Sequence, residues 1–227
     1  MKKGMKSEKL YPKLVIIDSE LLCLAPQKLV AISGFDAFTQ ALESFTSKNS
    51  SIISDYFALK SLELIISNFE KSWESPENID AREKMALGSL LSGFSIGITD
   101  TNLAHAMSHP ISAHYGIQHG LSVLLCTFQE IQFNKVVVAE KYSKVASFFN
   151  HDVQNKKTIE TLIDNLHRWV QKFDIKLNFE TYNIPKSAIE KLVLDAIEIG
   201  GIQTNPRPVD IKQLEQLYEK AWRGAID

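Results

Sequence analysis

Apolar residues recur every three or four positions along most of this chain, and this spacing most strongly limits what it can fold into. In residues 54–69, for example, Phe57, Leu62, Ile65 and Phe69 fall on one face of a helix. Similar patterns predict helices at 33–47, 81–98, 103–108, 121–133, 136–149, 158–173 and 187–199, and a last helix capped by Asp210 that runs to Trp222. The segment 81–98 is rich in small residues that let another backbone come close, so we expect it to be the buried central helix. The predicted fold class is mainly α, with about nine helices.

One segment departs from this pattern. Residues 10–18 contain the apolar, β-branched run Leu14–Ile17, which predicts a short buried strand. A single strand cannot satisfy its own backbone hydrogen-bonding groups. We therefore expect it to be displaced or to pair with a second copy of the chain, and a homodimer joined through this strand is the favoured outcome.

Composition excludes several classes of protein. Hydrophobic residues make up 44% of the 227 and charged residues 23%, enough apolar material for a sizeable core. The net charge of −2 provides no field that would draw the chain to nucleic acid or to an anionic membrane. The apolar runs are far shorter than the roughly 20 residues of a membrane span, and no signal-peptide stretch follows the basic start. Cys23 and Cys126 lie in apolar contexts and form no CxxC pair, so we expect reduced cysteines and a cytoplasmic location.

Four of the six histidines, His105, His109, His114 and His119, fall within fifteen residues. A cluster of imidazoles is what a divalent transition metal requires, whereas a single histidine is more often hydrogen-bonded to the backbone. His105 and His109 are four apart and lie on one face if the segment is helical. The glycines on either side of residues 117–119 would let the chain turn and fold the side chain of His119 back. For this cluster we favour metal binding or catalysis over a structural role.

Asp36 and Gln40 are also four residues apart, on the helix that opens after Gly34. Their oxygen atoms could add hard ligands to a pair of histidines. The alternative for Asp36 is a purely local role, because Ser33 and Asp36 have the spacing of a capping box and a carboxylate is favoured in a first helical turn.

These residues resemble the iron-containing (group III) alcohol dehydrogenases. The segment SGFDAFTQALESF is similar to that family's G-x-D-A-x-x-H-A-x-E, and AHAMSHPISAHYGIQHG to its H-A-x-x-H-P…H-G pattern. TNPRP with the last amphipathic helix, and LYPKLVIIDSELLCLAP near the start, are similar as well. The resemblance thus covers nearly the whole chain.

The resemblance implies a helical-bundle domain of the dehydroquinate synthase-like fold, C-terminal in the family, with one residual N-terminal strand. It implies that Asp36, His105 and His119 bind Fe²⁺ or Zn²⁺ and that His109 lies beside the nicotinamide and the substrate. Gln40 stands where the family usually has histidine, and would be a fourth, weaker ligand or a hydrogen-bonding neighbour. The substrate would be a small alcohol or aldehyde, with no nucleic acid or membrane as partner.

Family members also carry an N-terminal domain that binds NAD(P) through a glycine-rich loop, and no GxGxxG or similar stretch occurs in this sequence. We therefore expect residues 1–26 to be a remnant strand and linker from the cofactor domain, and 27–227 to be the metal-binding domain. Such a chain would be half of an NAD(P)-dependent alcohol dehydrogenase, inactive by itself. The alternatives are a non-catalytic helical domain retained for assembly or partner binding and, less favoured, a metal-dependent cyclising synthase.

Overall fold

A computed structural model describes residues 7–149 and 158–225, and every regular element within these ranges is helical. The prediction of a mainly α fold is confirmed. The α-helices are α1 (Ser19–Leu22), α2 (Gln27–Thr46), α3 (Ile52–Glu74), α4 (Ile79–Thr99), α5 (Leu103–Tyr115), α6 (His119–Ala146), α7 (Ile159–Lys172), α8 (Ile189–Ala196), α9 (Gly201–Thr204) and α10 (Ile211–Arg223), with short 3-10 helices η1 (Glu8–Leu10), η2 (Glu180–Tyr182) and η3 (Lys186–Ala188).

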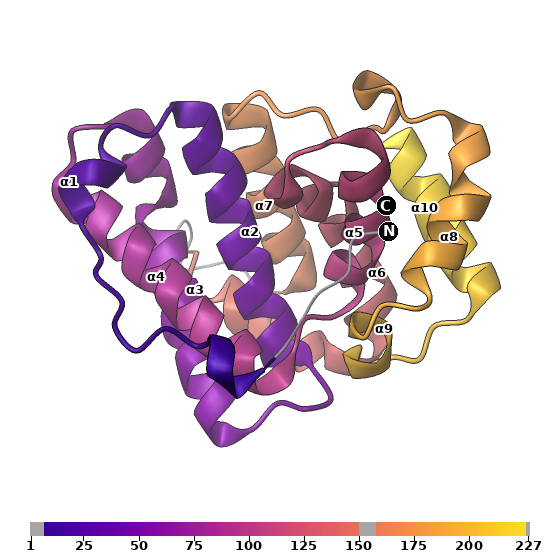
Figure 1. Ribbon diagram of the computed structural model, residues 1–227, viewed down its shortest axis with the longest axis horizontal. Helices are drawn as coiled ribbons and strands as arrows, with labels where there is room; N and C mark the ends of the chain where they lie inside the picture. The colour runs from indigo at the N-terminus through magenta and orange to yellow at the C-terminus, as the bar shows by residue number, and fades with distance from the viewer. Residues whose placement is uncertain (1–6, 150–157, 226–227) are drawn as a thin grey trace.

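Two hydrophobic clusters share the long helix α6. One joins it to α2, α3, α4 and α7 around edge-to-face aromatic rings, such as Phe69 and Trp169 with centroids 5.0 Å apart. The other joins it to α5, α8 and α10 around Met107 and Tyr218, whose hydroxyl donates to the Met107 carbonyl at 2.7 Å. Figure 1 shows α2 and α6 in the middle of the molecule, with α3 and α4 on one side and α8 and α10 on the other.

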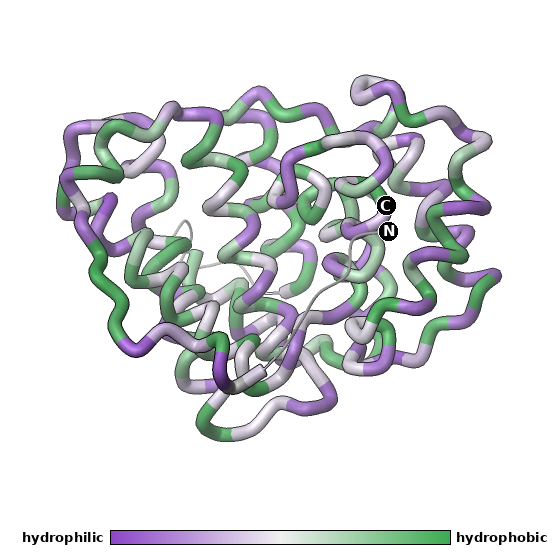
Figure 2. The backbone as a smooth tube through the Cα atoms, viewed as in Figure 1, coloured by the Kyte–Doolittle hydropathy of each residue, from purple (hydrophilic) through white to green (hydrophobic). Residues whose placement is uncertain are grey.

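The prediction of a strand at residues 10–18 is wrong. After η1 these residues form an extended coil that leads to α1 along the outer edge of the molecule (Figure 1). The tube of Figure 2 is green there, and Leu14 and Ile16 are 75% and 79% exposed. A strand forms only where a neighbouring strand accepts and donates its backbone hydrogen bonds, and the described residues contain no such neighbour.

The largest differences between predicted and observed helices concern three of the predicted helices. Residues 103–108 were expected to end before Pro110, but α5 continues to Tyr115. The burial of His105, Met107 and Ile111 outweighs the roughly 3 kcal/mol that an internal proline costs a helix. Residues 121–133 and 136–149 form the single helix α6, which is kinked at Val138.

The helix α4 is not the central one. It is buried along one face only, whereas nearly every residue of α2 from Val30 to Thr46 is buried. The small residues of α4 do allow a close approach at one point, because a Cβ on Gly88 would lie 2.8 Å from Ile65 of α3. Within the described ranges, no helix is both long and apolar enough to cross a bilayer.

Candidate metal centre

Asp36 and Gln40 are half-buried positions of α2 with buried neighbours on either side in the sequence. The amide nitrogen of Gln40 donates to Asp36 Oδ2 at 3.3 Å, and its amide oxygen accepts from Ser92 Oγ of α4 at 2.9 Å. This chain of contacts fixes the Asp36 carboxylate and leaves its Oδ1 facing α5. In this geometry Gln40 orients the Asp36 carboxylate, and its role as a fourth ligand stays a prediction.

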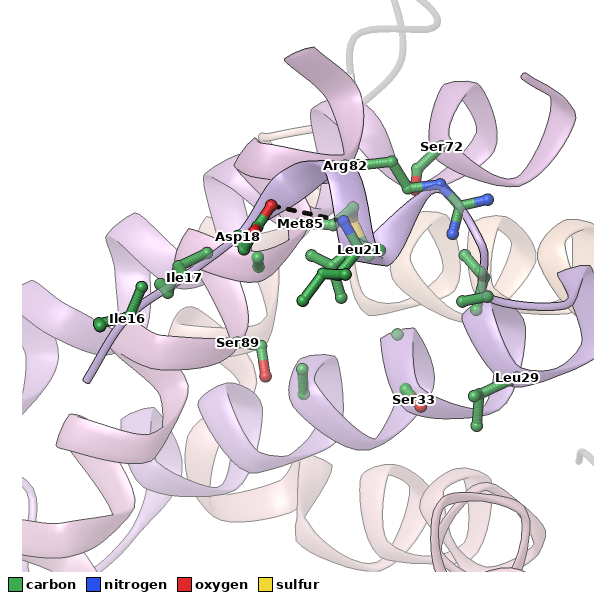
Figure 3. A pocket seen from close by; sticks show the side chains of 16 residues that line it. Ile16, Ile17, Asp18, Leu21, Leu29, Ser33, Ser72, Arg82, Met85 and Ser89 are labelled. Carbon is green, nitrogen blue, oxygen red and sulfur yellow. Dashed lines mark hydrogen bonds between the residues drawn. The ribbon is translucent and has the colours of Figure 1, made fainter. Parts of the chain in front are cut away.

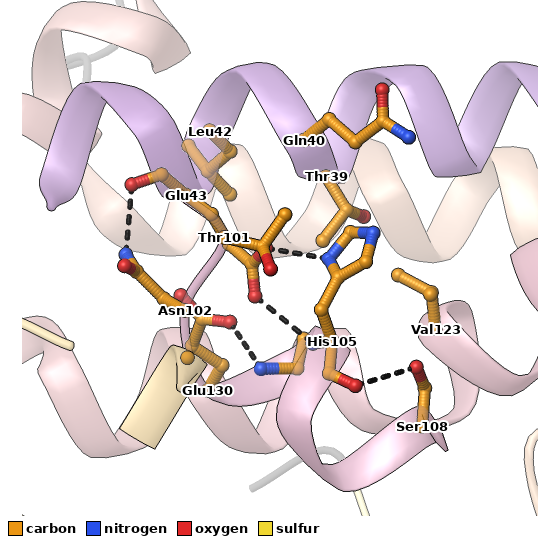
Figure 4. Close-up of polar contacts among 12 residues, drawn as sticks. Thr39, Gln40, Leu42, Glu43, Thr101, Asn102, His105, Ser108, Val123 and Glu130 are labelled. Carbon is orange, nitrogen blue, oxygen red and sulfur yellow. Dashed lines mark hydrogen bonds and ion pairs between the residues drawn. The ribbon is translucent and has the colours of Figure 1, made fainter. Parts of the chain in front are cut away.

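His105 projects from α5 toward α2, and Glu43 holds it there (Figure 4). The ring Nδ1 donates to Glu43 Oε2 at 2.5 Å, and the backbone N–H of His105 donates to Glu43 Oε1 at 3.1 Å. The glutamate is fully buried, and the histidine is 3% exposed. With Nδ1 turned to Glu43, Nε2 points toward Asp36 Oδ1, 3.4 Å away.

His119 reaches the same place from the first residue of α6. Gly116, at φ 64°, ends α5 in the left-handed conformation that glycine adopts at low cost and allows the turn. Gly120 lets α6 start directly against α2, since a Cβ there would lie 2.4 Å from the Ile32 carbonyl oxygen and 3.1 Å from Asp36 Cβ. As a result, His119 Nε2 lies 3.8 Å from Asp36 Oδ1.

One ligand atom from each of Asp36, His105 and His119 lies within 4.8 Å of the other two. Asp36 Oδ1 and His105 Nε2 are buried and face each other at 3.4 Å without a well-formed hydrogen bond, and a cation between them would bind both. Two ligands, each about 2.05 Å from a tetrahedral ion, lie about 3.3 Å apart, close to the observed spacings. Two imidazoles and a carboxylate suit Fe²⁺ and Zn²⁺ alike. These residues therefore fit the metal that their pattern predicts.

Two neighbouring carboxylates change the pKa of His105. Burial alone would lower the pKa of His105, but Glu43 and Asp36 outweigh it and raise the pKa to about 10. Burial would raise the pKa of Glu43, yet the neighbouring imidazolium holds it below the ordinary value. A metal ion at Nε2 would displace the second ring proton, as metal binding to histidine does generally.

A second buried carboxyl group, Glu130 of α6, lies behind Glu43. It accepts from the Ala104 backbone N–H at 2.7 Å and shares a hydrogen bond with Glu43. Burial, with the negative charge of Glu43, raises its pKa well above the ordinary value. The raised pKa favours the protonated form of Glu130, which can donate to Glu43 and so support the histidine indirectly.

The remaining two histidines of the cluster lie apart from the three converging ligand atoms. His109 is half-buried, with its ring centroid 5.7 Å from that of His119. His114 pairs instead with Asp195 of α8, with Nε2 and Oδ2 2.6 Å apart. The structure thus brings His105 and His119 to the converging ligand atoms, leaves His109 in contact with the His119 ring, and directs His114 elsewhere.

Sequence reasoning assigned no role to Glu43, Glu130 or Ser92. For Glu43 a signal was available, because it follows Asp36 by seven residues and so falls on the same helical face. The sequence holds no comparable signal for Glu130 or Ser92, which reach this region from other helices.

A family model described as "Fe-containing alcohol dehydrogenase family, C-terminal" matches residues 30–222. Over 217 residues the chain is 28% identical to the NAD-dependent methanol dehydrogenase of Bacillus methanolicus, a match that covers 94% of this chain and 57% of that protein. Over 151 residues it is 33% identical to the sulfoacetaldehyde reductase of Bilophila wadsworthia, covering 66% and 39% of the two chains. The chain spans about half the length of the curated relatives it matches.

Solved structures show the same fold. An archaeal halo-thermophilic alcohol dehydrogenase from a Red Sea brine pool superposes with a TM-score of 0.88 at 27% identity, over 96% of this chain and 57% of that one.

Proposed function

Because the chain belongs to the Fe-containing alcohol dehydrogenase family, as its resemblance implied, we propose that it forms the metal-binding half of an NAD(P)-dependent enzyme. The full enzyme would interconvert a small alcohol and an aldehyde or ketone by hydride transfer. The convergence of Asp36, His105 and His119 on one point, with two buried atoms that lack hydrogen-bond partners, carries this proposal.

Asp36, His105 and His119 would hold Fe²⁺ or Zn²⁺, and a bound ion supplies a Lewis acid that polarises the substrate oxygen. Glu43 fixes the tautomer and direction of His105, as carboxylates commonly do for metal-bound histidines. Gln40 restrains the Asp36 carboxylate. His109, beside His119, would relay the hydroxyl proton or position the nicotinamide ring.

The chain alone is expected to bind metal and to lack dehydrogenase turnover. Hydride transfer requires a nicotinamide held in a reactive orientation, and such orientation accounts for roughly 7–11 kcal/mol of the barrier. In the family a glycine-rich phosphate loop holds the dinucleotide, and this sequence contains no such loop.

A second function, that of a non-catalytic domain for assembly, is favoured by one observation. The segment Leu14–Ile17 presents apolar side chains to solvent, including Leu14 and Ile16. Exposed apolar surface of this kind marks interaction sites, so a homodimer joined through this segment is the expected assembly.

The experiment is a metal analysis of the purified chain by inductively coupled plasma mass spectrometry, with NADH titrated alongside. We expect about one Fe or Zn per chain, lost in His119→Ala and retained in His114→Ala, whose histidine pairs with Asp195. Metal-free wild-type protein after growth with iron and zinc would favour the assembly function. Tight NADH binding with alcohol oxidation by the chain alone would contradict its role as an enzyme half.

A further inference from the structure

A cavity of about 480 Å³ lies between α1, α2 and α4. Most of its wall is apolar, with Leu21 from α1 and Met85 from α4 among the lining side chains (Figure 3). On α2 it is lined by Leu29, Val30, Ser33, Gly34 and Ala37. None of Asp36, Gln40, His105 and His119 lines this cavity.

Arg82 of α4 lines the cavity and is only 3% exposed. Its Nε and one of its terminal nitrogens are buried without a hydrogen-bond partner, and Glu77 acts on it through its charge, with no ion-pair contact among the described residues. Burial lowers the pKa of the guanidinium, yet arginine stays protonated in proteins. A buried cation of this kind requires a partner, because removing a charge from water is strongly unfavourable unless an acceptor replaces the solvent.

A second donor faces the same cavity. Ser72 of α3 is fully buried, and its hydroxyl has no hydrogen-bond partner. The one carboxylate of the lining, Asp18, is engaged as the N-cap of α1, where its Oδ1 accepts from the backbone N–H groups of Glu20 and Leu21 at 3.0 and 3.4 Å. Figure 3 shows the guanidinium of Arg82 apart from Asp18, with Leu21 between them, so the Arg82 side of the cavity is available to an anion.

We propose that this cavity binds a monocarboxylate with a short hydrocarbon tail. The fork of N–H groups on Arg82 matches a carboxylate, and the Ser72 hydroxyl adds a third donor. The apolar walls cover the tail, and the volume falls within the range of small-molecule sites. A phosphate dianion fits less well, because its three oxygens need more donors than these two side chains offer.

The test is isothermal titration calorimetry of the 227-residue chain with octanoate. Octan-1-ol has the same tail without the charge, acetate has the carboxylate without the tail, and inorganic phosphate is the other anion. We expect saturable octanoate binding at one site, with affinity lower by at least about tenfold for each of these three compounds. Arg82→Gln should weaken octanoate binding at least about tenfold, while Arg223→Gln, the same change at an exposed arginine, should leave it unchanged.

A second variant keeps the proposal testable should Arg82→Gln fail to fold, as judged by its circular dichroism spectrum. Ala86→Leu fills the cavity from α4 and leaves the guanidinium intact, so it should also weaken octanoate binding. Equal octanoate affinity in wild type and in a folded Arg82→Gln or Ala86→Leu protein would overturn the proposal. So would octan-1-ol binding as tightly as octanoate, or binding of phosphate in its place. None of these measurements depends on metal content, so their failure is distinct from a failure of the proposed function.

Discussion

Replacing Glu43 with glutamine removes one charge and one hydrogen-bond acceptor beside His105, and it leaves the shape of the side chain almost unchanged. The two carboxylate oxygens accept two different N–H groups of the same histidine, the ring Nδ1–H at 2.5 Å and the backbone N–H at 3.1 Å. An amide has a single acceptor oxygen, so one of these donors must face an NH₂ group. Either the ring loses the contact that directs Nε2 to Asp36, or a buried backbone N–H is left unsatisfied.

The magnitude follows from what the carboxylate does for the histidine. Loss of a group that orients a metal-bound imidazole typically costs 10–100-fold in metal affinity, or about 1.4–2.7 kcal/mol. A buried donor without an acceptor costs the fold a further ~1–3 kcal/mol. We therefore expect Glu43→Gln to bind Zn²⁺ about 10–100 times more weakly than wild type and to unfold at lower urea concentration.

The assay is a Zn²⁺ titration in competition with a chromophoric chelator, on metal-stripped protein. Glu63→Gln is the matched control, because Glu63 lies on α3 with its side chain half exposed and contacts only Lys60 at 3.0 Å among the described ion pairs. This control should bind Zn²⁺ as wild type does. The reasoning is refuted if Glu43→Gln keeps wild-type affinity while His105→Ala loses the metal, since His105 would then be a ligand that Glu43 does not orient.

Three further predictions test the surroundings of the centre. Gln40→His adds an imidazole at a position that faces Asp36 and should raise Zn²⁺ or Fe²⁺ affinity by about tenfold or more in the same competition assay; unchanged affinity would show that residue 40 does not reach the ion. In metal-free protein the raised pKa of Glu130 means that the folded state keeps a proton that the unfolded state releases above pH 4.5. Wild-type stability should therefore fall relative to Glu130→Gln by about 1.4 kcal/mol per pH unit from there up to the folded-state pKa, and a pH-independent difference in urea unfolding would contradict this. Gly120→Ala should destabilise the protein by about 1–3 kcal/mol, because its Cβ meets the Ile32 carbonyl, whereas Gly93→Ala, with open space around it, should stabilise it by about 0.5–1 kcal/mol; equal urea midpoints would refute the close-approach argument.

The sequence alone determined the features that depend on neighbours along the chain. The last helix was predicted at its cap and nearly at its end, because Asp210 accepts from the Gln213 N–H three residues later. The candidate ligands Asp36, His105 and His119 came from a family resemblance carried by short motifs, and the structure brings these three side chains together. The helical spacing of apolar residues fixed the class of fold for the same local reason.

Only the tertiary structure decided what depends on contacts between distant segments. The run Leu14–Ile17 has the composition of a strand but forms a coil, because strand formation depends on a partner that the run does not itself encode. Pro110 stays inside α5 because the packing of this helix on α6 and α8 outweighs the tendency of proline to end a helix. Glu43 meets His105 across 62 positions of sequence, and Glu130 meets Ala104 across 26. Two glutamates thus have pKa values shifted in opposite directions after folding, lowered for Glu43 and raised for Glu130, since burial and neighbouring charges set the pKa.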